Sequence, residues 1–216
     1  MIYLLDKPAE WTSFDLVKKV RNITGEKAGH AGTLDPLATG LMIVATGRDT
    51  KKLHELTGLD KTYVAEFLLG RKTDTADQEG KILQEDFERA RRLEKEQIKA
   101  AVTKLKGGHE LAVPLYSAVK VDGKPLYRYA RTGEAPPRIP KRIMNVIDVS
   151  LIDIISTSSL GITVTLEISV ASGVYIRSLA EYFGELLGVP AMMWNLRRIK
   201  VGDYVIERAT SIEDLV

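Results

Sequence analysis

The apolar residues near the start of the chain predict a strand followed by an amphipathic helix. Residues 2–5 form a short apolar run, and residues 16–23 place leucine, valine and isoleucine three or four positions apart. Thr12 can cap the N-terminus of this helix, and Gly25 can end it in a left-handed conformation. We therefore expect a strand, a short connection and a helix between Thr12 and Gly25.

Two more strands and one long helix are predicted before the middle of the chain. The apolar run 41–45 and the alternating segment 62–69 have strand patterns. Segments 28–40 and 70–80 are rich in glycine, threonine or charged residues and predict loops. Residues 85–106 carry dense charge of both signs with apolar side chains on one helical face, which predicts a single solvated helix.

The second half of the chain is richer in strand patterns. Residues 115–121 end at a strong turn signal, and residues 143–155 and 160–170 predict two long strands. Residues 176–187 form an amphipathic helix that precedes a last pair of strands. This order of elements predicts an α+β fold, with a largely antiparallel mixed central sheet flanked by helices.

Composition adds limits to this picture. The chain has 216 residues, of which 44% are hydrophobic and 28% charged, as expected for a folded protein of one domain or at most two small ones. The absence of cysteine excludes disulfides, thiol nucleophiles and cysteine metal sites. No segment has the pattern of a signal peptide or the length of an apolar membrane span, so we expect a cytoplasmic protein that acts away from membranes.

The glycine-rich segment around Asp35 is the first candidate for chemistry. Pro36 restricts Asp35 to extended geometry, while Gly32 and Gly40 permit unusual turns. Such a loop can hold a carboxylate rigidly at the rim of a cleft. An aspartate before proline is also common turn punctuation, and from this segment alone that interpretation is the stronger one.

A second candidate lies where segment 160–170 gives way to the helix at 176–187. Tyr175 and Arg177 fall near a strand end and a helix N-terminus. A guanidinium there can pair with a carboxylate and keep it ionised. The alternative is a surface arginine beside an interfacial tyrosine.

Cations and tyrosines concentrate between residues 116 and 142. Seven cations against two acids leave an excess of five positive charges at 120–142, in a chain whose net charge is only +2. Cations contact phosphates and aromatic rings stack on bases, so this mixture favours RNA over a simple solvated face. Residues 197–200 form a second basic cluster.

The other common kinds of site find no support in the sequence. The three histidines, His30, His54 and His109, lack zinc-ligand spacing, and the acidic stretch 74–80 misses the calcium-loop pattern. No phosphate-binding glycine loop, dinucleotide fingerprint or serine triad is visible. We therefore expect carboxylate, tyrosine and arginine chemistry with neither a metal nor a cofactor.

Seven segments, in order along nearly the whole chain, share the motifs of one family. They are Leu5-Asp6-Lys7-Pro8 with Trp11-Thr12-Ser13, GHAGTLDPLATG at 29–40, Lys61-Thr62-Tyr63, GRKTDTADQEG at 70–80, VPLYSAVKVDGKPLYRYAR at 113–131, GVYIRSLA at 173–180 and LRRIKVGDY at 196–204. With them the chain resembles the bacterial TruB-type tRNA pseudouridine-55 synthase family, and GHAGTLDP is the most specific of the seven.

The resemblance implies an enzyme that detaches uracil from its ribose in the T loop of tRNA, rotates it and rejoins it through carbon 5. The uridine must first be flipped out of the folded loop. Asp35 falls on the family's carboxylate nucleophile, which attacks either the base or C1′ of the sugar. Arg177 looks like the partner of Asp35, and Tyr63 resembles the tyrosine that stacks on the target base.

Further positions are expected to contact the substrate. His30 resembles the residue that inserts into the RNA or holds its flipped form, and Tyr175 and Leu196 fall on family contact positions. Asp74 matches a family acid with a supporting role near the site. Lys120 belongs to the basic tract that we expect to bind the T stem-loop.

The chain departs from the family pattern in places. Glu10 stands where the family usually has glycine, and Val174 where it usually has threonine, although neither removes a catalytic group. Relatives commonly continue into a small RNA-binding domain, often of the PUA type; we expect residues 1–216 to be the catalytic domain alone, and a monomer. A non-catalytic tRNA-binding factor and a synthase for another RNA site are the alternatives.

Overall fold

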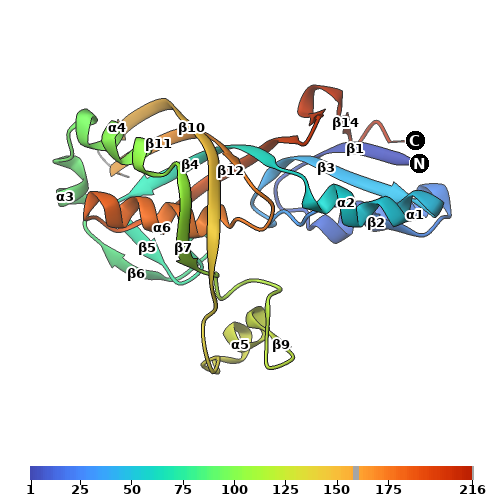
Figure 1. Cartoon of the computed structure of the whole chain (residues 1–216), viewed down its shortest axis with the longest axis horizontal. Helices are drawn as coiled ribbons and strands as arrows, with labels where there is room; N and C mark the ends of the chain where they lie inside the picture. The colour runs from blue at the N-terminus through green and yellow to red at the C-terminus, as the bar shows by residue number, and fades with distance from the viewer. Residues whose placement is uncertain (158–160, 216) are drawn as a thin grey trace. The chain divides into compact units, whose positions relative to one another are not determined.

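The structure is a computed structural model that describes residues 1–157 and 161–215 (Figure 1). The chain divides into two compact units, each of which combines segments far apart in sequence. The first unit comprises Met1–Val64, Ser169–Ser172 and Asn195–Val216, and the second comprises Ala65–Ile168 and Gly173–Trp194. Among the described residues, no helix is long and apolar enough to cross a membrane.

The first unit is built on strands in the order β14-β1-β3-β12. The strands are β1 (Ile2–Lys7), β2 (Ala28–His30), β3 (Thr39–Thr46), the C-terminal part of β12 (Ala191–Val201), β13 (Tyr204–Val205) and β14 (Thr210–Ser211). β1 runs antiparallel to β3, whereas β14 is parallel to β1 and β12 is parallel to β3. β2 pairs with β3 and β13 with β12, both antiparallel.

Helix α1 (Ser13–Thr24) covers β2 and β3 of the first unit. Thr12 and Asp15 form a reciprocal capping box at its start, and Gly25 ends it with φ 67°. The buried face of α1 carries Leu16 and Val20, as its apolar spacing predicts. The remaining helices of this unit are η1 (Gly47–Lys52), α2 (Leu53–Gly58) and η2 (Ile206–Arg208).

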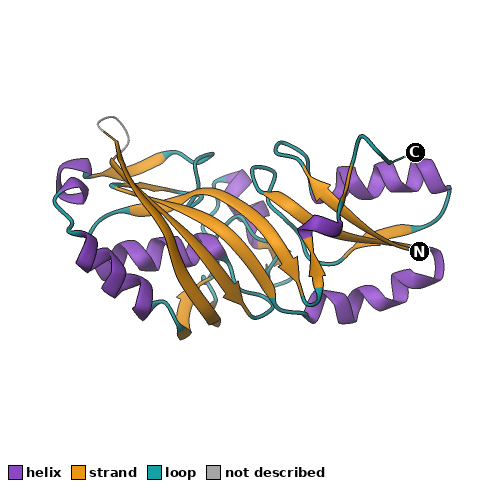
Figure 2. Cartoon of the chain, turned by 90° about the horizontal axis from the view of Figure 1, so that it is seen from above, coloured by secondary structure: helices purple, strands orange, loops and turns teal. Residues whose placement is uncertain are grey.

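The second unit contains the longest strands, which twist strongly (Figure 2). Its strands are the C-terminal part of β4 (Lys61–Leu69), β5 (Arg71–Thr73), β6 (Ile82–Glu85), β7 (Gly107–Ala112), β8 (Lys120–Val121), β9 (Lys124–Pro125), β10 (Lys141–Thr157) and β11 (Gly161–Val170). The order of the longer strands is β4-β11-β10-β7, and β10 and β7 are antiparallel.

Helices α4 (Lys95–Lys104) and α6 (Ile176–Leu187) pack on each other and on these strands. The Phe67 ring on β4 lies 5.8 Å from the Phe183 ring on α6, inside the core of this unit. Two shorter helices are α3 (Phe87–Arg91) and α5 (Leu126–Thr132). Figure 1 shows α5 and β9 projecting from the rest of the second unit, in the segment that carries the basic tract.

The predicted fold class is confirmed: the chain is mixed α and β, with a large, mostly antiparallel sheet and flanking helices. The predicted strand at 2–5 and the helices at 12–25 and 176–187 are also present. Residues 143–155 and 161–170 lie in long strands, while residue 160 is outside the described residues.

Three expectations about elements were wrong. Segments 28–40 and 70–80 are not pure loops, because Ala28–His30 pairs with β3 and Arg71–Thr73 pairs with β6. Residues 85–106 hold two helices rather than one, since Asp86 caps α3 and Glu94 starts α4 with its own capping box. Of the predicted strand 115–121 only Lys120–Val121 forms a strand, and it pairs with β9 across the predicted Asp122-Gly123 turn.

Candidate functional site

The loop that carries Asp35 is fastened to the start of α1. The backbone N–H of Leu34 donates to Ser13 Oγ at 2.9 Å, and Ser13 Oγ donates back to the Leu34 carbonyl at 3.0 Å. The N–H of Glu10 donates to the Pro36 carbonyl at 2.9 Å. Both residues that flank Asp35 are therefore held by hydrogen bonds, and Asp35 itself is half-buried.

Lys7 adds a charged anchor below the same loop. Its side chain is fully buried, and its ammonium donates to the carbonyls of Pro8 (2.9 Å), Trp11 (2.6 Å) and Pro36 (3.0 Å). A buried lysine is tolerated only where its donors are satisfied, so the three carbonyls and the ammonium fix one another. The site therefore depends on a residue that the sequence offered only as part of a motif.

Arg198 on β12 also supports this loop. The residue is 1% exposed, and its guanidinium donates to the Leu41 carbonyl at 2.7 Å and to the Gly32 carbonyl at 3.2 Å. The backbone comes so close here that a Cβ on Gly40 would meet the Arg198 carbonyl oxygen at 2.2 Å, and Gly40 has φ 104°. Only glycine fits at this position.

His30 ends β2 beside this support. Burial, and then the positive charge of Arg198, lower the pKa of His30, so its ring is neutral at neutral pH. Its Nδ1 is buried and has no hydrogen-bond partner among the described residues. A neutral, half-buried ring suits insertion between bases better than it suits phosphate binding.

Tyr63 and Leu196, the other predicted residues of the first unit, are both buried. Tyr63 lies on β4 two residues beyond Lys61, whose ammonium donates to the Thr57 and Leu59 carbonyls at 2.6 Å each. Burial, reinforced by the charge of Arg198, lowers the pKa of Lys61 to about 8. The first unit thus holds Asp35, His30, Tyr63 and Leu196, together with three buried cations: Lys7, Lys61 and Arg198. Arg198 belongs to the predicted basic cluster at 197–200, but its burial removes it from the surface of that cluster.

Arg177 stands in the first turn of α6 in the second unit and is 5% exposed. It donates to the carbonyls of Thr75 (3.0 Å) and Tyr116 (2.9 Å), and its Nη1 lies 3.6 Å from Asp77 Oδ2. The carboxylate beside Arg177 in this unit is thus Asp77, which is buried and which the sequence did not single out. The pairing of Arg177 with Asp35 stays a prediction.

Asp74 occupies the start of the turn that ends at Gly80. Its Oδ1 accepts the Lys81 N–H at 2.8 Å, so its visible role is to close the turn. Asp77 Oδ1 accepts the Glu79 N–H at 3.1 Å inside the same turn, while its Oδ2 faces Arg177. Only burial distinguishes Asp77 from Asp74, and the sequence does not show which of the two aspartates is buried.

Tyr175 is the N-cap residue of α6, whereas Lys120 lies on β8, which pairs with β9 in the projecting part of the second unit. Tyr175 packs on the cluster of Val113, Val121 and Leu126, whereas Lys120 is exposed. Two other cations of the basic tract face tyrosines of the same tract: Lys124 Nζ lies 4.3 Å from the Tyr129 ring centre, and Arg131 lies 5.6 Å from that of Tyr127. Some cations and tyrosines of the basic tract therefore contact one another and stabilise the tract itself.

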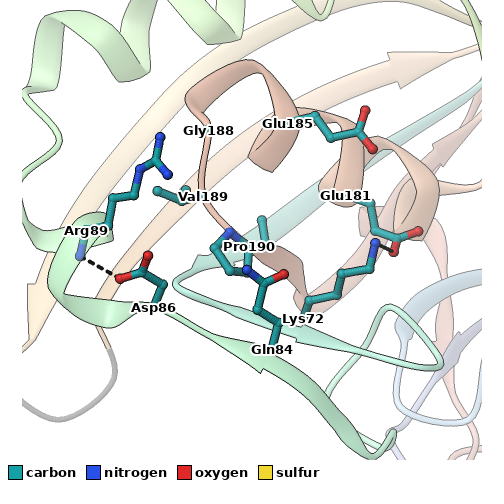
Figure 3. A pocket seen from close by; sticks show the side chains of 10 residues that line it. Lys72, Gln84, Asp86, Arg89, Glu181, Glu185, Gly188, Val189 and Pro190 are labelled. Atoms are coloured by element: carbon teal, nitrogen blue, oxygen red, sulfur yellow. Dashed lines mark hydrogen bonds and ion pairs between the residues drawn. The ribbon is translucent and has the colours of Figure 1, made fainter.

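A hollow of about 250 Å³ lies elsewhere in the second unit, between β5, β6, α3 and the end of α6 (Figure 3). Lys72 is paired with Glu181 at 3.0 Å, and the Asp86 carboxylate accepts the Arg89 N–H at 3.0 Å. None of the predicted site residues lines this hollow. Among the described residues no cluster of three or more histidine, aspartate or glutamate side chains could hold a metal ion.

Comparison with known proteins gives a consistent result. The family described as TruB family pseudouridylate synthase (N terminal domain) matches residues 18–176. The tRNA pseudouridine synthase B of Ralstonia nicotianae is 43% identical over 216 residues, which cover 99% of this chain and 67% of that protein. The same enzyme of Chloroherpeton thalassium is 39% identical over 218 residues, which cover 99% of this chain and 88% of that protein.

Solved structures extend the comparison to the fold. A chain in a Cbf5-Nop10-Gar1 complex has a TM-score of 0.72 and 28% identity, and the match covers 99% of this chain and 52% of that one. A chain in an H/ACA RNP bound to a substrate RNA containing 2′-deoxyuridine has a TM-score of 0.71 and 25% identity. That match covers 99% of this chain and 51% of the solved one. This chain therefore spans about two thirds of the Ralstonia relative and about half of these solved chains.

Proposed function

We propose that this chain, which belongs to the TruB family of pseudouridylate synthases, isomerises uridine 55 in the T loop of tRNA to pseudouridine. The observation that carries the proposal is the Asp35 loop: a half-buried carboxylate whose neighbours are held by Lys7, Ser13 and Arg198. Such a fixed carboxylate suits nucleophilic attack, because little reorganisation is needed when the substrate arrives.

The reaction needs no net exchange of atoms. The Asp35 carboxylate bonds to the base or to C1′, the bond between N1 and C1′ breaks, and the uracil turns within the site. Carbon 5 then joins C1′, the bond to Asp35 is released, carbon 5 loses its proton and N1 gains one. In this scheme Tyr63 stacks on the target base, and Arg177 pairs with Asp35 and keeps it ionised.

Binding of the RNA requires that the uridine leave its stack in the T loop. We assign His30 to the space that the flipped base leaves, where its neutral ring supports stacking. Tyr175 and Leu196 are assigned to contacts with the flipped nucleotide, and Lys120 to the phosphates of the T stem. Asp74 keeps a supporting role, through the turn that contains Asp77.

The direct test is pseudouridine formation on unmodified tRNA by the purified protein. We expect product at position 55, and we expect Asp35→Asn to lower the rate by roughly a thousandfold or more while leaving thermal unfolding unchanged. Asp153→Asn, at an exposed position, is the matched control and should remain active. An active Asp35→Asn protein would contradict the assignment of the nucleophile.

The same experiment separates the alternatives. Tight binding of tRNA without product in the unaltered chain would identify a non-catalytic binding factor. Product at a uridine outside the T loop would identify a synthase for another RNA site. Sequencing of chemically labelled pseudouridines in cellular RNA, with and without this gene, extends the test to all RNAs.

A further inference from the structure

A second hollow, of about 570 Å³, runs along helix α1 in the first unit; we name it the α1 hollow. It is lined by Glu10, Trp11, Asp15, Lys18, Lys19, Asn22 and Ile23. Most of these residues are three or four positions apart, so one stripe of the helix forms one wall. The stripe combines an aromatic ring, two lysines and polar groups, and none of them has a part in the chemistry proposed above.

The α1 hollow begins beside the Asp35 loop. The Glu10 N–H donates to the Pro36 carbonyl, and the buried Lys7 ammonium donates to the carbonyls of both Trp11 and Pro36. The wall that carries Glu10 and Trp11 is therefore fixed directly to the residue that follows Asp35. The hollow and Asp35 lie in the same unit, so an RNA that places a uridine at Asp35 can also reach the hollow.

The backbone at Glu10 is in an unusual conformation. Its φ is 68°, in the left-handed region that favours glycine, and only three non-glycine residues among the described ones have positive φ. Such a conformation costs free energy in a residue with a side chain and persists only where its surroundings hold it. Glu10 adopts this conformation although it has a side chain, and its carboxylate lines the α1 hollow.

The chemistry of the α1 hollow matches a nucleotide. An indole ring offers a face for stacking on a base, and lysines contact phosphates. A carboxylate accepts hydrogen bonds from the amino groups of bases. Asp15 also lines the hollow, and its carboxylate accepts hydrogen bonds from the Thr12 N–H (2.9 Å) and hydroxyl (2.6 Å) in the capping box. These bonds hold Asp15 at the helix start and lower its pKa, so the contacts with phosphate are left to the two lysines.

Resting on the proposed function, we infer that the α1 hollow binds an unpaired nucleotide of the RNA substrate near the flipped uridine. Trp11 stacks on its base, Lys18 and Lys19 contact its phosphates, and Glu10 accepts a hydrogen bond from an amino group of the base. The hollow of the second unit does not fit this ligand, since no aromatic residue lines it and Lys72 is paired with Glu181 (Figure 3).

The fluorescence of Trp11 tests the stacking directly. The chain has two tryptophans, so Trp194→Phe leaves Trp11 as the sole indole. In an Asp35→Asn/Trp194→Phe protein, an unmodified T stem-loop RNA should quench the emission in parallel with binding, measured by anisotropy of labelled RNA. Binding without a change in emission would overturn the nucleotide site while leaving the proposed function intact. Failure of the unaltered chain to bind the RNA would overturn both.

Matched substitutions separate stacking from packing. Trp11→Leu keeps an apolar side chain next to the helix start but removes the aromatic face, and it should raise the KM for tRNA by roughly tenfold or more. Trp11→Phe keeps an aromatic face and should restore most of the affinity. Equal KM values for the two variants would contradict stacking by Trp11.

Glu10→Gly provides an independent readout. It relieves the left-handed strain, so the melting temperature should rise, because glycine adopts this conformation freely. If the carboxylate contacts the base, the KM for tRNA rises at the same time by about fivefold or more, as expected for a lost hydrogen bond to a charged group. A more stable protein with an unchanged KM would remove Glu10 from the site.

Discussion

Asp35 lies in a loop whose geometry depends on side chains from other parts of the chain. Ser13 holds the residue before it, Lys7 the residue after it, and Arg198 the backbone at Gly32. Lys7, Ser13 and Arg198 are themselves buried, so a displacement of the loop would leave their polar groups short of hydrogen bonds. The position of the carboxylate is therefore set by a network rather than by the turn that contains it.

Lys61 makes the stability of this region depend on pH. Its pKa in the folded chain is about 8, below its ordinary value of 10.5, because burial disfavours the ammonium. Above pH 8 the folded chain has released this proton while the unfolded chain still binds it, so Lys61 opposes folding less as the pH rises through 8 toward 10.5. We expect the free energy of unfolding to increase by roughly 2–3 kcal/mol between pH 7 and 10 because of Lys61.

The measurement is urea unfolding of the wild type and of Lys61→Met at several pH values. The difference between their free energies of unfolding, wild type minus variant, should rise with pH in that window. Lys51→Met is the control, since Lys51 is exposed and should give a flat difference. A flat difference for Lys61→Met as well would show that the ammonium is solvated in the folded chain.

At the scale of single residues, the family motifs indicate Asp35, Arg177 and Tyr63 as candidate site residues, but they do not show which charged residues of the same motifs are buried. Lys7, Asp77 and Arg198 are charged residues, and a charged residue is exposed by default. Their burial follows from pairing with carbonyls and with other charged groups across the chain, which no local pattern encodes. Asp77 shows this best, because it shares a turn with Asp74 and differs from it in exposure.

The contact between strands β3 and β12 depends on one glycine. A Cβ on Gly40 would lie 2.2 Å from the Arg198 carbonyl oxygen, and Gly40 has φ 104°. Gly40→Ala should therefore lower the free energy of unfolding by about 3 kcal/mol or more, through backbone strain and overpacking together. Because Arg198 supports the Asp35 loop, activity should fall even at temperatures where the variant is folded.

Gly58→Ala is the control for this prediction. A Cβ on Gly58 would meet no neighbouring atom within 4 Å, and the φ of Gly58 is not positive, so alanine should be neutral or slightly stabilising there. Thermal unfolding of both variants, followed by an activity assay at low temperature, checks the two parts of the prediction. A Gly40→Ala protein as stable as Gly58→Ala would contradict the close approach of β3 and β12.

At the scale of elements, prediction succeeded where the signal is local. The capping residues of α1, Thr12 and Gly25, are visible in the sequence and are present in the structure. Strand β2 was missed because its three residues form a strand only by pairing with β3, which begins well after it. The division of 85–106 into α3 and α4 depends on capping by Asp86 and Glu94, which dense charge conceals.

For the whole molecule, net charge says little about RNA binding, whereas its distribution says more. The basic tract retains exposed cations, among them Lys120, Arg128 and Arg138, beyond those that face its own tyrosines. Replacing each of the three by alanine should weaken tRNA binding and reduce the slope of log affinity against log salt by about one unit for each phosphate that the variant no longer binds.

The control for this prediction is the pair Lys95→Ala and Lys99→Ala, which removes exposed lysines from α4 without touching the tract. Filter binding at several salt concentrations gives the slope of log affinity against log salt for the tract variants and for the control variants. An unchanged slope in the tract variants would place the phosphate contacts elsewhere on the chain.

The hydrogen bonds from Arg198 to Gly32 and Leu41 join residues 166 and 157 positions apart. A ribosome that adds about 5–20 residues per second delivers Arg198 roughly 10–30 s after Gly32. During that interval the nascent chain already contains Asp35 but lacks the side chain that shapes its loop. The loop around Asp35 therefore gains this support only late in translation, so a truncated product released before β12 would carry the proposed nucleophile without the side chain that holds its loop.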